Sequence, residues 1–176
     1  MELVLLMGIP ATGKSSFCRE KFFRTHIRLN LDMLRTRRRE GLLMEACLTG
    51  KTKFVVDNTN LSLEERARFI PLAKAAGFQV VGYFFESQVT DAIRRNFSRQ
   101  AGEQIPPIAI HNSVSRLVPP SAGEGFDQLF FVRIAGRGGF RVEKWSPRKH
   151  KSEISAGLQS ATEPKAANED RPRKIR

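Results

Sequence analysis

The segment from Glu2 to Ser16 constrains the fold more than any other part of the 176-residue chain. An apolar run, residues 3–7, leads into the pattern G-x-x-x-x-G-K-S over residues 8–15, and a helix-compatible stretch follows. A buried strand, a Gly-rich loop and a helix in this order are typical of α/β folds in which the loop wraps a phosphate group. The glycines let backbone N–H groups turn inward, and the helix N-terminus attracts negative charge.

We therefore expect a nucleoside-triphosphate site on this loop. Lys14 would neutralise charge on the β- and γ-phosphates, and the Ser15 hydroxyl would bind Mg²⁺. The expected ATP-binding residues of the loop and the helix start are Gly8, Ile9, Pro10, Ala11, Thr12, Gly13, Lys14, Ser15 and Ser16. The alternative interpretation is a strand-to-helix turn that holds no phosphate.

Further along the chain, short apolar runs alternate with helical patterns. Strands are expected over residues 2–7, 27–29, 53–56, 78–85 and 129–132, and helices over residues 15–23, 31–48 and 90–100. Another helix begins with the capping box Ser62-x-x-Glu65 and ends before Gly77, with Pro71 predicting a kink or break inside it. The alternation predicts a three-layer α/β/α fold of the P-loop NTPase type, with a mostly parallel sheet of about five strands.

Two acidic residues follow predicted strands at the edge where parallel sheets bind ligands. Asp32 has Arg35 three residues on, which we expect on the same helical face; such a carboxylate suits deprotonation of a hydroxyl beside an anionic substrate. Asp57 closes an apolar strand, the setting of an aspartate that holds Mg²⁺ through water. The alternatives are a helix N-cap for Asp32 and a turn aspartate feeding Asn58-Thr59-Asn60 for Asp57.

Arginines follow on the predicted helix over residues 90–100, where Arg95 and Arg99 would share one face. Residues 101–107 begin with Ala-Gly, which favours flexibility, and end with Pro-Pro, which favours a rigid backbone. The region over about residues 90–120 therefore suits a helical lid. Phosphoryl transfer needs charge stabilisation on the transferring group, which arginine commonly supplies. A solvated basic helix face is the alternative for any single arginine.

The composition is basic, with 30 Lys and Arg against 18 Asp and Glu and a net charge of +12. Residues 144–176 hold nine basic and four acidic side chains, so we expect a basic, disordered tail over residues 146–176 behind a domain at residues 1–145. The apolar runs are too short to cross a membrane, the start lacks the charge of a secretory signal, and the two cysteines form no framework. A cytoplasmic protein without membrane contact is expected.

Four segments together resemble the 5′-hydroxyl polynucleotide kinases: residues 8–15, 30–35, 56–60 and 95–99. The likeness covers about residues 2–133 and includes Gly123-Glu124-Gly125-Phe126. It implies ATP and Mg²⁺ as cofactors and nucleic acid with 5′-hydroxyl ends as substrate. It also implies Asp32 as general base, Lys14 and Ser15 on the ATP phosphates, and Arg99, with Arg95, as lid arginines.

By the same resemblance, Arg35 would contact the acceptor phosphate, and Asp57, Asn58, Thr59 and Asn60 would form the acceptor-site loop. We prefer Asp57 as a partner of Arg35 over Asp57 as a metal ligand. The family's phosphatase signature, Asp-x-Asp, does not occur in the sequence, so a stand-alone kinase module, or one acting with a separate phosphatase or ligase, is expected.

Two other functions stay open: a kinase of a small metabolite, such as a zeta-toxin-like enzyme, and an ATP-dependent nucleic-acid-binding module without kinase activity. The basic charge favours a polyanionic substrate over a small sugar, and a pure switch would not need the Asp32 and Arg35 pair. RNA or DNA preference, strandedness and oligomeric state stay open as well. Aromatic residues such as Phe22, Phe23 and Phe69 could contact bases or belong to the core.

Overall fold

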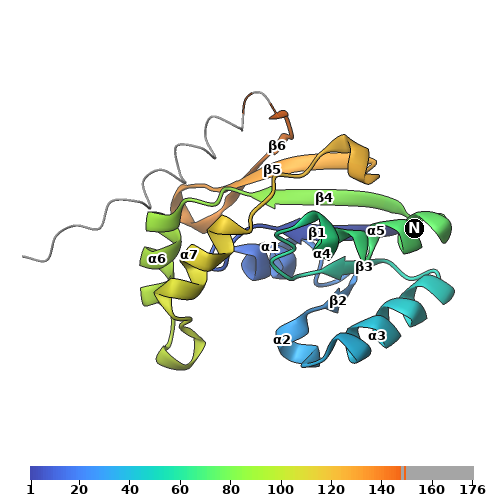
Figure 1. Ribbon diagram of the computed structural model, residues 1–176, viewed down its shortest axis with the longest axis horizontal. Helices are drawn as coiled ribbons and strands as arrows, with labels where there is room; N and C mark the ends of the chain where they lie inside the picture. Colours follow the sequence, from blue (N-terminus) through green and yellow to red (C-terminus); the bar gives the residue numbers. More distant parts are fainter. Residues whose placement is uncertain (148, 150–176) are drawn as a thin grey trace, which may run out of the picture.

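The computed structural model of the protein describes residues 1–147 and 149. One six-stranded sheet runs through it in the order β2-β3-β1-β4-β5-β6 (Figure 1). Its strands are β1 (Glu2–Met7), β2 (Ile27–Leu29), β3 (Phe54–Val56), β4 (Gln79–Phe85), β5 (Gln128–Ile134) and β6 (Phe140–Lys144). The first five are parallel, and β6 pairs antiparallel with β5. The predicted tail lies almost entirely outside the described residues.

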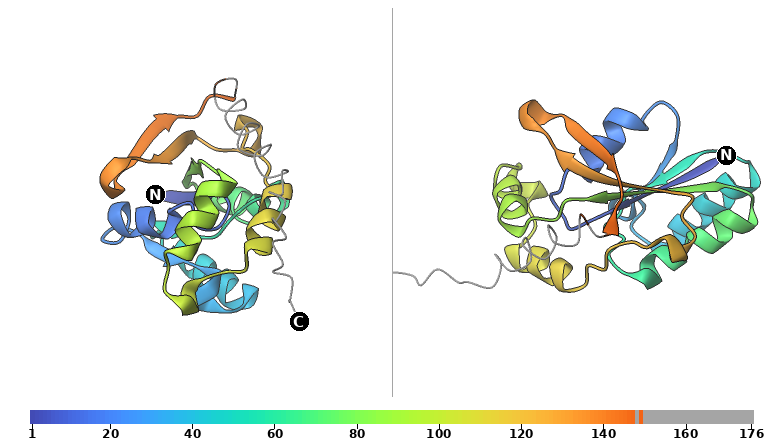
Figure 2. Two further views of the ribbon diagram at one scale, coloured as in Figure 1. Left: turned by 90° about the vertical axis from the view of Figure 1, so that its left-hand side faces the viewer. Right: turned by 90° about the horizontal axis from the view of Figure 1, so that it is seen from above.

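Helices cover both faces of the sheet, which confirms the α/β class (Figure 2). They are α1 (Lys14–Lys21), α2 (Leu31–Leu34), α3 (Arg37–Thr49), α4 (Leu63–Ala67), α5 (Ile70–Ala75), α6 (Val89–Phe97) and α7 (Pro107–Ser115). Helix α1 packs on one face through Phe17 and Cys18, and Phe22 directly after the helix joins the same cluster. Helices α3, α5, α6 and α7 pack on the other. Three 3-10 turns add Ala101–Glu103, Ala122–Glu124 and Gly136–Gly138.

The central strand β1 explains the continuous apolar run near the chain start. Val4 and Leu6 face the cluster under α1, whereas Leu3 and Leu5 face the cluster under α3 and α5. The side chains from Leu3 to Met7 are at most 1% exposed. A parallel strand covered on both faces needs apolar residues at every position, and this burial fixes where the following loop leaves the sheet.

One expectation about elements was wrong, one was confirmed, and one strand was not predicted. The helix expected over residues 31–48 is interrupted at Arg35, which adopts φ 68°, and Thr36 then caps α3 by accepting from Arg39 N–H. The break expected near Pro71 is present, because α4 ends at Ala67 and α5 begins at Ile70. The sixth strand, β6, was not predicted; it is a half-exposed edge strand after the glycines of the Gly136–Gly138 turn.

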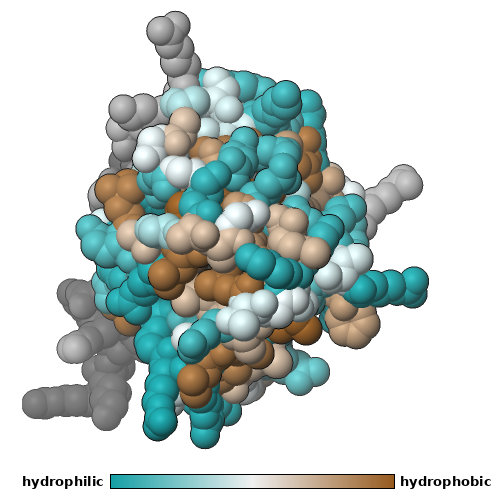
Figure 3. All heavy atoms as spheres, turned by 90° about the vertical axis from the view of Figure 1, so that its right-hand side faces the viewer, coloured by the Kyte–Doolittle hydropathy of each residue, from teal (hydrophilic) through white to brown (hydrophobic). Residues whose placement is uncertain are grey.

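The face at the amino ends of the strands carries apolar and hydrophilic side chains side by side (Figure 3). The carboxyl ends of the strands meet at the opposite edge, beside the α6–α7 hairpin (Figure 1). Within the part of the chain that the structure describes, no helix is long and apolar enough to span a bilayer.

Gly82 tests the packing between β4 and its neighbours. A Cβ at this position would lie 2.6 Å from Leu129 Cδ2 and 2.8 Å from both Met7 Cε and Phe126 Cε1. Gly82→Ala should therefore lower the free energy of unfolding by about 1–3 kcal/mol through overpacking. Gly41→Ala is the control, because nothing lies within 4 Å and the residue is inside α3. It should raise stability by about 0.5–1 kcal/mol. Denaturant unfolding measures both, and equal effects would contradict the packing described here.

Candidate nucleotide and acceptor site

The predicted phosphate loop lies at the carboxyl end of β1 and leads directly into α1. Gly8 adopts φ 145° and Gly13, the residue before α1, adopts φ 91°, and both conformations favour glycine. The Gly8 N–H donates to Thr59 O at 2.9 Å, so the start of this loop is attached to the segment after β3. The loop therefore has the shape and the anchoring that the sequence pattern demands.

Lys14 is buried inside the loop. Its Nζ donates to Gly8 O at 2.8 Å, to Ile9 O at 2.7 Å and to Thr12 Oγ1 at 3.3 Å. The pKa of Lys14 is lowered to about 7, mainly because the amine is buried; nearby Asp57 opposes this shift and Arg99 adds to it. An anionic group on the loop would favour the protonated amine. Anion binding and protonation of Lys14 therefore strengthen each other.

A cleft of about 340 Å³ opens above the loop and brings together most of the predicted site residues. Its lining includes Pro10, Ala11, Gly13, Lys14, Ser15, Ser16, Asp32, Asp57, Asn58, Thr59 and Arg99. Ile105, Ala109 and Ser113 of the α6–α7 hairpin close the opposite wall. Segments more than 100 residues apart in the sequence thus enclose one cavity.

Asp32 lies in the first turn of α2 and is exposed to the cleft. It is not the helix cap, because Asn30 fills that position and accepts from Met33 N–H at 3.1 Å. Asp32 makes no ion pair or hydrogen bond with the described residues. Its carboxylate is therefore available to a molecule in the cleft.

Asp57 is 2% exposed and pairs with Arg28, not with Arg35 as we expected. Arg28 Nε lies 2.9 Å and Nη2 2.5 Å from Asp57 Oδ2. The preferred Asp57–Arg35 pair is thus wrong, because Arg35 terminates α2 in a left-handed conformation and does not line the cleft. Sequence reasoning missed Arg28, although an arginine within the short strand Ile27–Leu29 was visible.

The loop after β3 is held by amide side chains. Asn58 Oδ1 accepts from Leu31 N–H at 2.8 Å, and its Nδ2 donates to Glu40 Oε1 at 2.7 Å. Asn60, buried and at φ 45°, donates through Nδ2 to Leu6 O at 2.7 Å. These two predicted substrate residues therefore fix the loop in the structure, while Thr59 lines the cleft.

The two candidate arginines of the α6–α7 hairpin approach the loop differently. Helix α6 ends at Phe97, so Arg95 and Arg99 do not share a helical face as expected. Arg95 Nε donates to Ala11 O at 2.8 Å and is half-buried, which lowers its pKa. Arg99 lies beyond the helix, lines the cleft and is exposed. One arginine thus attaches the hairpin to the loop, and the other is free to meet a phosphate.

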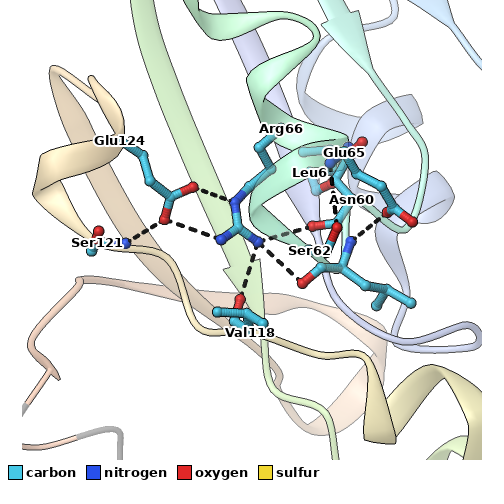
Figure 4. A network of polar contacts seen from close by, with 9 residues as sticks. Leu6, Asn60, Ser62, Glu65, Arg66, Val118, Ser121 and Glu124 are labelled. Carbon is cyan, nitrogen blue, oxygen red and sulfur yellow. Dashed lines mark hydrogen bonds and ion pairs between the residues drawn. The ribbon is translucent and has the colours of Figure 1, made fainter.

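A buried arginine that the sequence analysis did not single out joins the post-β3 segment to the end of the hairpin (Figure 4). Arg66, 0% exposed, donates to Glu124 through Nε at 2.5 Å and Nη2 at 3.0 Å. Its Nη1 donates to the carbonyls of Asn60, Leu61 and Val118 at 3.0–3.2 Å. Arg66 thereby positions the loop beside the cleft relative to the segment that follows α7.

The donor set fits a magnesium nucleotide. Mg²⁺ usually keeps several waters and binds through one or two protein oxygens together with substrate phosphates. Ser15 and Asp57 both line the cleft, so a hydroxyl and a carboxylate that could act through water are present there. Among the described residues there is no cluster of three His, Cys, Asp or Glu side chains that could hold a metal ion without substrate.

Fold and site together define a P-loop kinase-like, ATP-binding phosphotransferase fold. A family profile described as an AAA domain matches residues 37–120. The bifunctional polynucleotide phosphatase/kinase of Schizosaccharomyces pombe is 29% identical over 132 residues, or 73% of this chain. The chain spans only 32% of that relative's length. The predicted resemblance to polynucleotide kinases is confirmed.

Solved structures agree with the fold. A putative kinase from Chloroflexus aurantiacus is 19% identical, with a TM-score of 0.57 and coverage of 92% of this chain and 97% of that chain. Kti12 of Chaetomium thermophilum in complex with ADP-AlF3 is 15% identical, with a TM-score of 0.59 and coverage of 90% of this chain and 96% of that chain. The AvrRxo1-ORF1:-ORF2 structure with ATP is 14% identical, with a TM-score of 0.65 and coverage of 93% of this chain and 66% of that chain. At such identities the likeness extends to the fold alone.

The lowered pKa of Lys14 predicts proton uptake when ATP binds. Near pH 8 the buried amine is mostly neutral, and bound phosphates raise its pKa, so binding takes up close to one proton. At pH 6 the amine is already protonated and contributes no uptake. Calorimetric titration with ATP in buffers of different ionisation enthalpy measures this. Lys14→Arg is the control because its charge does not titrate, and equal uptake in both proteins at pH 8 would refute the coupling.

Arg66 predicts a large loss of stability on truncation. Arg66→Met leaves Glu124 and three backbone carbonyls without their buried partner, which should cost about 3–5 kcal/mol. Arg116→Met is the matched control, since Arg116 pairs with Glu65 at the surface with its side chain 61% exposed. It should cost less than about 1 kcal/mol. Similar unfolding free energies for the two variants would show that the Arg66 network does not hold this region.

Proposed function

We propose that this chain transfers the γ-phosphate of ATP to the 5′-hydroxyl end of RNA or DNA in the presence of Mg²⁺. The observation that carries the proposal is the exposed carboxylate of Asp32, which has no ion pair or hydrogen bond among the described residues and lines the same cleft as Lys14 and Ser15. A phosphate loop alone supports nucleotide binding. A free carboxylate beside it supports a reaction in which an acceptor hydroxyl must lose a proton.

In the proposed step, the acceptor oxygen attacks the γ-phosphorus in line with the bond to the β-phosphate. A P–O bond forms to the acceptor, the bond to the bridging oxygen breaks, and ADP leaves. Asp32 accepts the proton of the hydroxyl. The protein's main contribution is to position the two substrates and to stabilise charge on the transferring group.

On the nucleotide side, Lys14 and the N–H groups of the loop hold the phosphates. Ser15 would hold Mg²⁺, which neutralises phosphate charge when bound. Arg99 meets the transferring group from the α6–α7 hairpin, and Arg95 attaches that hairpin to Ala11. Asp57 favours the protonated form of Lys14 and is itself balanced by Arg28.

On the acceptor side, Thr59 and Asn58 line the same cleft as Asp32. Arg35, three residues beyond Asp32, is exposed but does not line the cleft, so in this proposal it meets an acceptor phosphate outside the cleft. Two observations favour a nucleic acid: the similarity to a polynucleotide phosphatase/kinase and the net charge of +12. A basic protein concentrates polyanions, whereas a small neutral substrate gains nothing from this field.

The reaction predicts a clear loss in Asp32→Asn. With radiolabelled ATP, Mg²⁺ and a 5′-hydroxyl oligonucleotide, the unmodified protein should move the label to the oligonucleotide. Asp32→Asn should lower kcat by at least about 100-fold, because the amide cannot accept the proton, and leave ATP binding within about twofold. Lys14→Ala should lose both activities.

The control is Glu45→Gln, which removes an exposed carboxylate on α3 that lines neither cleft. It should keep full activity. Transfer of label only to small hydroxyl compounds would replace the proposal with a metabolite kinase. ATP binding or hydrolysis without transfer to any acceptor would favour a non-kinase nucleic-acid-binding module.

A further inference from the structure

A second cleft lies next to the phosphate cleft and has no role in the reaction as described so far. It occupies about 620 Å³ between α1, β2 and the start of α2. This volume is within the range of ligand sites, about 300–1,000 Å³, and exceeds that of the phosphate cleft. A cavity of this size beside a candidate active site has room for part of a substrate.

The two clefts adjoin at the start of α1. Ser15 and Ser16, at the start of α1, line both of them. Met33 lines the second cleft and directly follows Asp32, the proposed base. The second cleft thus opens on the acceptor side of the loop. On the other side, Ile134 and Phe140 of the β5–β6 hairpin approach Gly13.

The rim of this cleft exposes large apolar side chains that a purely structural role would bury. Phe23 is 79% exposed, Met33 62% and Ile27 43%. Behind them, Phe22 and Val55 form an apolar wall and are buried. Flat aromatic and soft aliphatic surfaces of this kind suit stacking with planar rings, which every nucleobase offers.

The charges around the cleft favour an anion. Arg19 lines it from α1, is exposed, and makes no ion pair with the described residues. Arg28 also lines it but is balanced by Asp57, and His26 is kept neutral because burial lowers its pKa. Glu103 is the one acidic side chain among the described lining residues. Arg19 is therefore the cation available to a phosphate.

We infer that the second cleft holds the unpaired nucleotides that follow the reacting 5′ end of the acceptor strand, with bases against Phe23 and Met33 and a phosphate near Arg19. The inference rests on the proposed function, because it assumes that Asp32 receives a 5′-hydroxyl. It adds a substrate preference: a single-stranded end several nucleotides long is a better acceptor than a lone nucleoside phosphate.

The test compares kcat/KM for phosphate transfer to a nucleoside 3′-monophosphate and to unpaired 5′-hydroxyl oligonucleotides of two to eight nucleotides, using the full chain. In the unmodified protein kcat/KM should rise over the first few nucleotides. Phe23→Ala and Arg19→Ala should each lower it about tenfold for the oligonucleotides and leave it unchanged for the monophosphate. Phe23→Trp should restore the value.

Salt dependence separates the two contacts. Arg19→Ala should reduce the slope of log(kcat/KM) against log salt by about one, because one phosphate contact is lost, whereas Phe23→Ala should keep the slope. The controls are Leu72→Ala, an apolar residue 49% exposed on α5, and Arg68→Ala, an exposed arginine after α4. Both should behave like the unmodified protein.

If Phe23→Ala and Arg19→Ala match these controls while the unmodified protein phosphorylates oligonucleotides, the cleft does not hold the acceptor strand and this inference is overturned. If the unmodified protein transfers phosphate to no nucleic acid at all, the proposed function itself fails. The two failures are thus distinguished by the unmodified protein alone.

Discussion

The pairing of β1 between β3 and β4 is the constraint on which the rest of the structure depends. Parallel register brings the carboxyl ends of β1 and β3 to one edge, with Leu5 beside Val56. The Gly8 N–H to Thr59 O bond and the Asn60 bond to Leu6 O then join the two segments just beyond their strands. A phosphate loop and an acidic loop that are about 50 residues apart in the sequence are thereby held within one cavity.

This edge of the sheet also brings several charged side chains together in a partly desolvated environment. Burial destabilises the protonated form of Lys14, and the negative charge of Asp57 partly offsets this cost. Arg28 in turn pairs with Asp57 and neutralises its charge. The result is a chain of alternating charges from the strand β2 to the phosphate loop, with Arg99 added from the hairpin. A ligand phosphate would complete this alternation, which is why the site fits an anion better than any neutral molecule.

Sequence reasoning predicted the parallel sheet, the phosphate loop and the position of Asp32 at the cleft, because each follows from local pattern. It failed where tertiary context decides. Arg35 adopts a left-handed backbone conformation, which cannot be predicted from the sequence because it is uncommon in residues other than glycine. The expected pairing of Arg35 with Asp57 was therefore wrong. Arg28 and Arg66 look like unpaired surface charges in the sequence. Only the register with β3 shows that Arg28 pairs with the buried Asp57, and only the return of the chain at Glu124 shows that Arg66 is internal. The edge strand β6 is half-exposed, so its five residues contain no continuous apolar run that would predict a strand.

The arginine content therefore has two separate explanations. The domain uses some guanidinium groups inside the protein: Arg66 satisfies five acceptor contacts, Arg28 holds Asp57, and Arg95 holds Ala11. A guanidinium group is planar and has five N–H donors, so it can bind several acceptors at once better than the ammonium group of a lysine can. Net charge alone therefore overstates how many cations can face a polyanion. What distinguishes the remaining arginines is position, since Arg19 and Arg99 lie on the walls of adjoining clefts with their side chains exposed. A phosphate backbone needs few cations for binding when these are placed on neighbouring walls of the site.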